Sequence, residues 1–267
     1  MAEPDRFEKR IEGIDTDLFA MISSQTTDDD RRTLLSIQRS IRKNGEYAYM
    51  EIGSHLGGTI QPHYLDPRCS LIYSIDKRPR FQPDERGCNF EYPDNSTERM
   101  LDYIEKSFPG LNINKIKTFD CDAGNVSSSE ITKSPVFCFI DGEHTNSAAY
   151  TDFISCLELC HPNAVIAFHD SQYIFEGIRR VKKHLVRRGI RFRGLMLGGS
   201  VYGILLGEAV DFFGTELNIL RKNEFLYFGK SRIELMVERS RNRCPRLWNF
   251  LRSCKDLGRG IVSKKCR

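Results

Sequence analysis

The sequence has little that points to a membrane-spanning or secreted protein. No apolar run is long enough to span a bilayer, and the N-terminus, Met-Ala-Glu-Pro-Asp-Arg, has no apolar segment of the kind that a secretory signal needs. The composition, 40% hydrophobic and 28% charged, is that of a globular protein, and 267 residues suffice to bury one sizeable core. We therefore expect a cytoplasmic protein.

The cysteines lack the spacing of a zinc site or a disulfide framework. There are nine of them, an odd number, and no two form a C-x-x-C pair. Cys138 and Cys156 fall within apolar stretches, where a thiol behaves as a small hydrophobic group. We expect these two to pack in the core.

The glycine-rich stretch 47–59 lacks the features of the two common phosphate loops. It has neither the G-x-G-x-x-G spacing nor a lysine followed by Ser or Thr. Instead, an apolar run leads into Glu51, Gly53, Gly57 and Gly58. The acid before the first glycine would repel a pyrophosphate, and the glycines let a ligand lie against bare backbone. The stretch therefore favours a ligand with a cationic or hydroxyl-rich face.

Apolar runs that alternate with helical patterns indicate an α/β fold with a doubly wound, mostly parallel sheet. Seven strands are predicted, at residues 47–52, 71–75, 113–119, 135–140, 164–168, 192–197 and 201–206. The last two flank Gly198-Gly199-Ser200, which predicts an antiparallel hairpin. Between the strands we expect helices that begin near Asn95 and cover 146–159 and 175–188, and a long loop at 77–96.

The chain divides into three predicted parts. Residues 1–45 read as a helical preface, in which Thr27 and Asp30 predict the start of the second helix. Residues 46–210 form the ligand-binding domain, and 211–267 a basic helical extension. From Arg221 to Arg267 there are 14 Lys or Arg against four acids. The positive formal net charge of the chain, +4, therefore comes from the extension.

One glycine and several charged or titratable residues follow the predicted strands, at the edge where ligands of open α/β sheets bind. They are Gly53, Asp76, Asp120 and Asp122, Asp141 with His144, and His169 with Asp170. A carboxylate at Asp76 is well placed to accept hydrogen bonds from a ribose. If the strands before Asp141 and Asp170 are neighbours, these two acids could share Mg²⁺ or Mn²⁺, with His169 as a further ligand.

These motifs, over residues 45–207, resemble class I S-adenosylmethionine (SAM) dependent methyltransferases, whose Rossmann-like sheet also ends in a hairpin. The resemblance implies that the loop with Glu51, Gly53, Ser54, His55, Gly57, Gly58 and Thr59 holds the methionine part of SAM. It also implies that Asp122, with Asp120 as the alternative, contacts the adenine amino group.

Asp141-Gly-Glu-His144 and His169-Asp170 are similar to the methyltransferase-24 family of small-metabolite and sugar O-methyltransferases. In related metal-dependent macrolide-sugar enzymes, acids at these strand ends hold Mg²⁺, and the equivalent of His144 is the general base. This resemblance implies that Asp141 lies beside SAM and the metal and that His144 acts as a neutral general base. His169 stands where those enzymes have an acid, which leaves the metal open.

We therefore expect methyl transfer to a hydroxyl of a small metabolite or sugar. Two alternatives remain: an NAD(P)-dependent oxidoreductase, or a non-catalytic protein that binds RNA or an anionic surface through its basic extension. Basic and apolar residues alternate at 246–252, which is consistent with an anionic membrane surface or with a terminal helix packed on the core. Nucleic acid is the less favoured partner, and the acceptor and the oligomeric state stay undefined.

Overall fold

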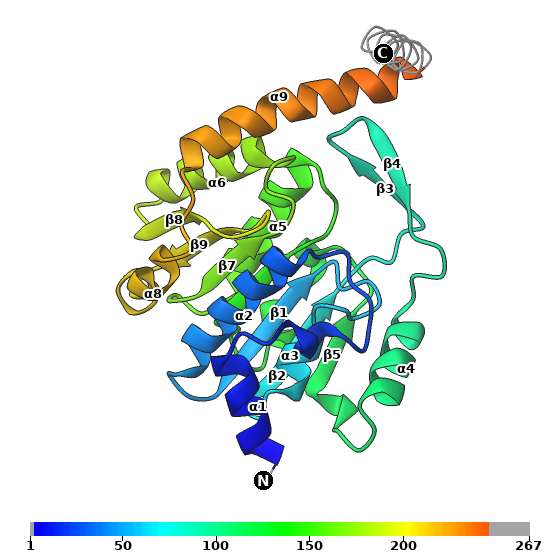
Figure 1. The fold of residues 1–267 in the computed structure, drawn as a ribbon, viewed down its shortest axis with the longest axis vertical. Helices are drawn as coiled ribbons and strands as arrows, with labels where there is room; N and C mark the ends of the chain where they lie inside the picture. Colours follow the sequence, from blue (N-terminus) through cyan, green and yellow to red (C-terminus); the bar gives the residue numbers. More distant parts are fainter. Residues whose placement is uncertain (1–2, 246–267) are drawn as a thin grey trace, which may run out of the picture.

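In the computed structural model, which describes residues 3–245, seven strands form one sheet in the order β5-β2-β1-β6-β7-β9-β8 (Figure 1). The strands are β1 (Tyr47–Ile52), β2 (Cys69–Ile75), β5 (Ile116–Phe119), β6 (Phe137–Ile140), β7 (Val165–Phe168), β8 (Phe192–Met196) and β9 (Tyr202–Leu206). The pairs among β5, β2, β1, β6 and β7 are parallel, whereas β9 is antiparallel to both β7 and β8. This confirms the predicted sheet and its terminal hairpin.

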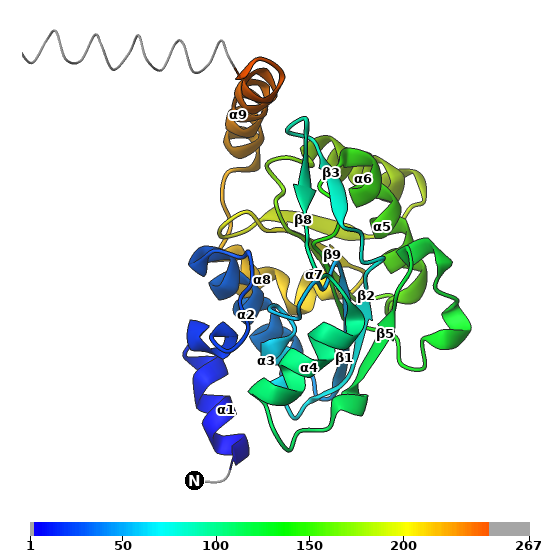
Figure 2. The same cartoon turned by 90° about the vertical axis from the view of Figure 1, so that its right-hand side faces the viewer.

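Helices cover both faces of the sheet (Figure 2). They are α1 (Glu3–Glu12), α2 (Asp28–Arg42), α3 (Gln61–Leu65), α4 (Thr97–Ser107), α5 (Asn146–Leu159), α6 (Phe175–Arg187), α7 (Ala209–Phe212), α8 (Gly214–Asn218) and α9 (Glu224–Arg243). The face that carries Tyr49 packs against α1 to α4, and the opposite face, with Met50, packs against α5 and α6. Cys138 and Cys156 are buried in the second core, as predicted.

The helical preface is docked on the sheet through buried polar contacts. Thr27 and Asp30 form the predicted capping box at the start of α2. The side chain of Gln61 is buried; its oxygen accepts the backbone N–H groups of Met21 and Ile22, and its amide donates to backbone carbonyls. Gln61 therefore ties the segment before α2 to the loop after β1.

Three local predictions were wrong. Residues 77–96 are no continuous loop, because β3 (Phe81–Asp84) and β4 (Cys88–Glu91) pair in a hairpin. Residues 113–115 form a 3₁₀ turn ahead of β5, since the Asn112 side chain accepts the N–H of residue 114. Helix α4 is capped by Ser96 rather than by Asn95.

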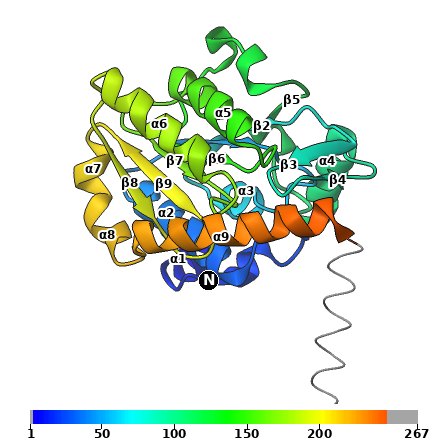
Figure 3. The same cartoon turned by 90° about the horizontal axis from the view of Figure 1, so that it is seen from above.

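The described part of the basic extension packs on the domain. Helix α9, in the predicted helical extension, runs along the top of the molecule to the β3-β4 hairpin (Figures 1 and 3). Phe228 packs on Phe175 and Tyr202 at one end, and Arg239 pairs with Glu85 at the other. The predicted membrane or packing segment at 246–252 lies outside the described residues. Within the described chain, no helix combines the length and apolarity needed to cross a bilayer.

Candidate active site at the carboxyl edge of the sheet

The glycine loop after β1 needs glycine because the chain passes close to other backbone. Gly53 has a φ of +88°, and a Cβ there would overlap the carbonyl group of Asp141. A Cβ on Gly58 would overlap the backbone of Ser23, where the helical preface crosses the loop. These glycines therefore permit the contact of the loop with β6 and with the preface.

Glu51 is fully buried at the end of β1. It accepts hydrogen bonds from the hydroxyl groups of Tyr49 and Thr59. Burial raises the pKa of this carboxyl to about 8, although the two hydroxyl groups oppose the shift. Glu51 lines none of the cavities described below, so its contact in this structure is with the loop itself, through Thr59.

A first cavity of 260 Å³ opens beside the ends of β1, β2 and β5. Asp76 and Asp122 line it, as predicted, whereas Asp120 does not. Asp76 accepts the backbone N–H groups of His55 (3.0 Å) and Arg78 (2.8 Å), and Asp122 pairs with Lys77 at 3.2 Å. The structure thus brings Asp76 and Asp122, the acids predicted for ribose and adenine, to one cavity that Asp120 does not line.

Sequence reasoning missed Asp152, which lines the same cavity from α5. Burial raises its pKa to about 7; Asp122 and Glu143 add to the shift and Lys77 opposes it. Asp152 shares one helical face with Ser147, Ala148 and Thr151, so a helical projection of 146–159 would have shown a polar face toward the sheet edge.

A second, small cavity of 40 Å³ continues the first, since both are lined by Gly53, Asp76 and Gln82. The other lining residues include most of the predicted loop, namely Ser54, His55, Gly58 and Thr59, together with Asp141, His144 and Tyr92. Gly57 lies behind the loop, against Met100 and Ile104 of α4. The two cavities together form an elongated cleft from Asp122 to His144.

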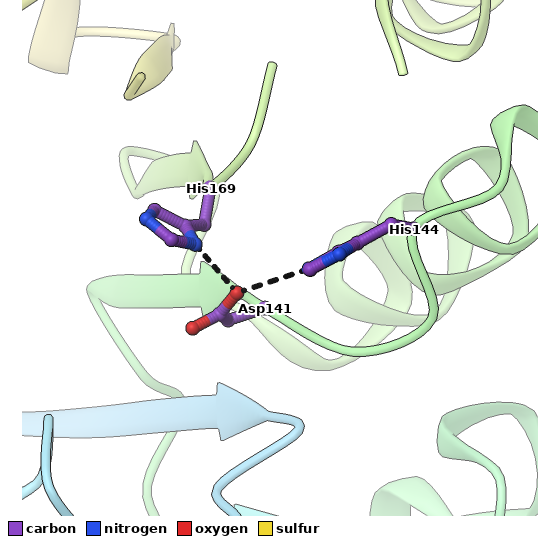
Figure 4. A group of neighbouring side chains, drawn as sticks. All are labelled: Asp141, His144 and His169. Atoms are coloured by element: carbon purple, nitrogen blue, oxygen red, sulfur yellow. Dashed lines mark hydrogen bonds and ion pairs between the residues drawn. The ribbon is translucent and has the colours of Figure 1, made fainter. Parts of the chain in front are cut away.

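At the inner end of this cleft, Asp141 holds two imidazole rings (Figure 4). His169 Nδ1 lies 2.8 Å and His144 Nε2 3.4 Å from Asp141 Oδ1. Burial by itself raises the pKa of Asp141, but the two rings overcome it and lower the pKa to about 2. The three residues follow β6 and β7, as the sequence predicted, and these two strands are neighbours.

More carboxylates surround the rings than the sequence suggested. Asp84 and Asp170 each place an oxygen 3.4 Å from His144 Nδ1. Burial lowers the pKa of His144, yet its bonds to Asp141 and Asp84 and the charge of Asp170 raise it to about 9. These carboxylates favour the charged imidazole, whereas the resemblance implied a neutral His144. Asp84 was missed because its hairpin was taken for a loop.

His169 faces a third cavity, of 380 Å³, on the other side of the cluster. Its Nε2 lies 3.4 Å from Asp30 of the preface but makes no hydrogen bond within the described residues. The cavity is lined mainly by polar side chains, among them Asp170, Gln172, Ser200, Tyr227, Lys230 and Glu234. The Asp141, His144 and His169 cluster thus stands between the elongated cleft and a separate polar cavity.

The cluster also fits a divalent cation. One ligand atom from each of Asp141, His144 and His169 lies within 4.8 Å of the others. His169 Nε2 is, in addition, a buried nitrogen without a hydrogen bond in the described chain. Asp170, predicted as a ligand, is outside this group but lies next to His144. Two imidazoles and a carboxylate suit Mn²⁺ or a later transition metal better than Mg²⁺.

Residues 50–171 match a family model described as a methyltransferase domain. Similar solved structures include the O-methyltransferase NovP, at 10% identity over 65% of this chain and 77% of that chain, with a TM-score of 0.50. Another is the O-methyltransferase TomG from Streptomyces achromogenes, in complex with SAM (13% identity, 77% and 89% covered, TM-score 0.47). MycE, from the mycinamycin biosynthetic pathway and in complex with Mg and SAH, has 13% identity, 74% and 54% coverage and a TM-score of 0.46. A search of curated proteins gives no match.

Proposed function

Because residues 50–171 match a family model described as a methyltransferase domain, we propose that this chain transfers the methyl group of SAM to a hydroxyl of a small polar acceptor. The observation that carries the proposal is the position of the Asp141, His144 and His169 cluster, between the elongated cleft and the polar cavity. A reacting methyl group at the end of the cleft and an acceptor oxygen from the cavity would meet at this cluster. The domain match favours this function over the oxidoreductase and the non-catalytic alternatives.

The cleft suits the three parts of SAM in order. Asp122 would meet the adenine amino group. Asp76 would meet the ribose hydroxyls through Oδ1, which keeps a lone pair beyond its bond to the backbone, whereas Oδ2 accepts both His55 N–H and Arg78 Nη1. The methionine part would lie along Gly53 and His55 in the smaller cavity. Gly53 supports this placement indirectly, because the absence of a side chain lets the loop pass close to the backbone of Asp141.

Bound SAM supplies an electrophilic methyl group, so the chain has to align the acceptor oxygen and receive its proton. Asp141 fixes both imidazole rings at the meeting point, and Asp170 lies on the acceptor side, 3.4 Å from His144. We assign proton transfer from the acceptor to His144 together with Asp170. Because its carboxylate neighbours raise the pKa of His144, this role requires that acceptor binding separates the ring from at least one of them.

A divalent cation at Asp141, His144 and His169 would lower the pKa of an acceptor hydroxyl and orient it. His144 would then be a ligand, and the proton would go to Asp170, which lies next to it. Removal of the metal would then reduce activity, and the two histidines predict that Mn²⁺ restores it better than Mg²⁺.

The polar cavity indicates a hydroxyl-rich acceptor such as a sugar. Its lining offers carboxylates at Asp170 and Glu234, which accept hydrogen bonds from hydroxyl groups, and the rings of Tyr173 and Tyr227, on which a sugar face can pack. A volume of 380 Å³ accommodates a small molecule or one unit of a larger one.

Calorimetric titration with SAM and with NAD⁺ tests the cofactor. Asp76→Asn should weaken SAM binding by about 10- to 100-fold, because a charge-assisted hydrogen bond is lost. Asp102→Asn, an exposed acid of α4, is the matched control and should bind as wild type. Binding of NAD⁺ without binding of SAM would refute the proposal.

Methyl transfer is then measured with radiolabelled SAM and a panel of sugars and other hydroxylated acceptors, with and without chelator and added Mn²⁺ or Mg²⁺. His144→Gln should lower kcat by roughly 10² to 10⁴ with little change in SAM affinity. His161→Gln, on an exposed turn, is the control. An active His144→Gln enzyme would remove His144 from the proposed role but leave the cofactor proposal standing.

A further inference from the structure

Helix α9 presents a stripe of large apolar side chains to the outside of the molecule. Phe225, Leu226, Ile233 and Met236 are 85%, 66%, 65% and 65% exposed, and Val237 is also exposed. At 100° per residue they fall on one side of the helix, and Gly229 and Ser240 fill the positions between them. We refer to Phe225, Leu226, Ile233, Met236 and Val237 as the α9 stripe.

The opposite side of the same helix is the one that packs on the domain. Ser231 and Leu235 are buried there, and Tyr227 and Phe228 contact the core next to them. The helix thus has an inner face that is already satisfied and a second apolar face without a partner in the described chain. Figures 1 and 3 show this outer side along the top of the molecule. An apolar stripe of this length indicates an interaction surface.

Basic side chains border the α9 stripe on both sides. Arg232 and Arg243 lie along one border, and Lys230 and Arg241 along the other. Lys230 and Arg241 pair with acids of the same helix, at 3.5 and 3.2 Å, whereas Arg232 has no carboxylate partner in the described chain. An apolar stripe between cationic borders is the pattern of helices that lie in the interface of an anionic bilayer.

A groove of 910 Å³ between α6 and the start of α9 extends this positive surface. Lys183, Arg221 and Lys222 line it together with Arg232, and none of the four is paired with a carboxylate within residues 3–245. The two acids of the groove, Glu176 and Glu224, are already paired with Arg179 and Lys182. The groove therefore has the charge to hold phosphate groups next to the exposed Phe225.

We propose that the outer side of α9 docks on an anionic phospholipid surface, with the α9 stripe among the acyl chains and the groove and borders against the headgroups. Charge decides against a second copy of the chain, because pairing two stripes would bring like-charged borders together. The apolar stripe decides against nucleic acid, which would leave these five side chains in water. The proposal is independent of the proposed catalysis.

Flotation with vesicles of phosphatidylcholine, with and without phosphatidylserine, tests the proposal on the full chain. Wild type should float with the phosphatidylserine vesicles and much less with phosphatidylcholine alone, and added salt should weaken the binding. Ile233→Ser/Met236→Ser should lower the affinity at least about tenfold, because two buried apolar side chains are lost. Leu111→Ser, at 40% exposure in the turn after α4, is the control outside this surface and should bind as wild type.

A second arm tests the charge. Arg232→Gln should weaken binding to phosphatidylserine vesicles and reduce its salt dependence, whereas Lys106→Gln, on the distant helix α4, should change neither. The proposal is overturned if wild type floats with neither vesicle, or if the double variant floats as well as wild type. It is also overturned if sedimentation shows a dimer that the double variant dissociates.

Discussion

Replacing Gly53 by alanine should destabilise the protein far more than the same replacement of Gly110. The two glycines have nearly identical φ values, +88° and +87°. A Cβ on Gly110 would meet no atom within 4 Å, whereas a Cβ on Gly53 would overlap the backbone of Asp141. Both alanine variants therefore place a side chain in a left-handed conformation, and only Gly53→Ala also disturbs the close approach between the β1 loop and β6.

The left-handed conformation costs roughly 1–2 kcal/mol for alanine at either position. At Gly53 the loop must also move away from Asp141, and forced overpacking of this kind costs about 1–3 kcal/mol. Backbone rather than a flexible side chain is the obstacle, so we expect the upper part of that range. The predicted difference between the two variants is thus about 2–3 kcal/mol.

Urea unfolding measures this difference, as a lower midpoint for Gly53→Ala at an unchanged slope. SAM titration provides a second readout: Gly110→Ala should bind as wild type, and Gly53→Ala should bind more weakly because the loop and Asp141 have moved apart. A difference in unfolding free energy below about 0.5 kcal/mol would refute the close approach as the reason for glycine at this position.

Three further predictions concern buried polar groups. Since the folded-state pKa of Glu51 is raised to about 8 from 4.5, the folded state binds the extra proton, and stability falls as pH rises from about 4.5 to 8. Glu51→Gln should remove this loss, so the stability of the variant relative to wild type should rise with pH. Urea midpoints at several pH values measure this difference, and a difference that stays constant with pH would contradict the raised pKa. Gln61→Leu should lower the free energy of unfolding by about 2–4 kcal/mol and speed proteolysis of the preface, because two backbone N–H groups lose their acceptor. Unchanged proteolysis would contradict the role of Gln61 in docking the preface. Arg42→Met should lower the free energy of unfolding by about 3–5 kcal/mol because it leaves the charge of Asp66 buried without its partner. Arg42→Met/Asp66→Leu should recover much of that loss. An equally unstable double variant would contradict the unpaired charge of Asp66 as the cause.

The sequence alone determined those features that depend on neighbours along the chain. Apolar runs predicted the seven strands to within a few residues, and the Thr27 and Asp30 pair predicted the start of α2, because strand burial and capping are local. Since parallel strands end at the same edge, the predicted acids at Asp76, Asp122 and Asp141 were found beside the cleft. The resemblance to methyltransferases rested on these same local motifs.

The tertiary structure decided the environment of those residues. Asp30 reaches His169 from the preface, and Asp84 reaches His144 from the β3-β4 hairpin, where it helps to raise the pKa of His144. Such contacts depend on how distant segments pack, which no local pattern encodes. The same holds for α9, whose two apolar sides look alike in sequence. Only packing decided that Leu235 is buried and that Ile233 faces outward, because either side could have met the domain.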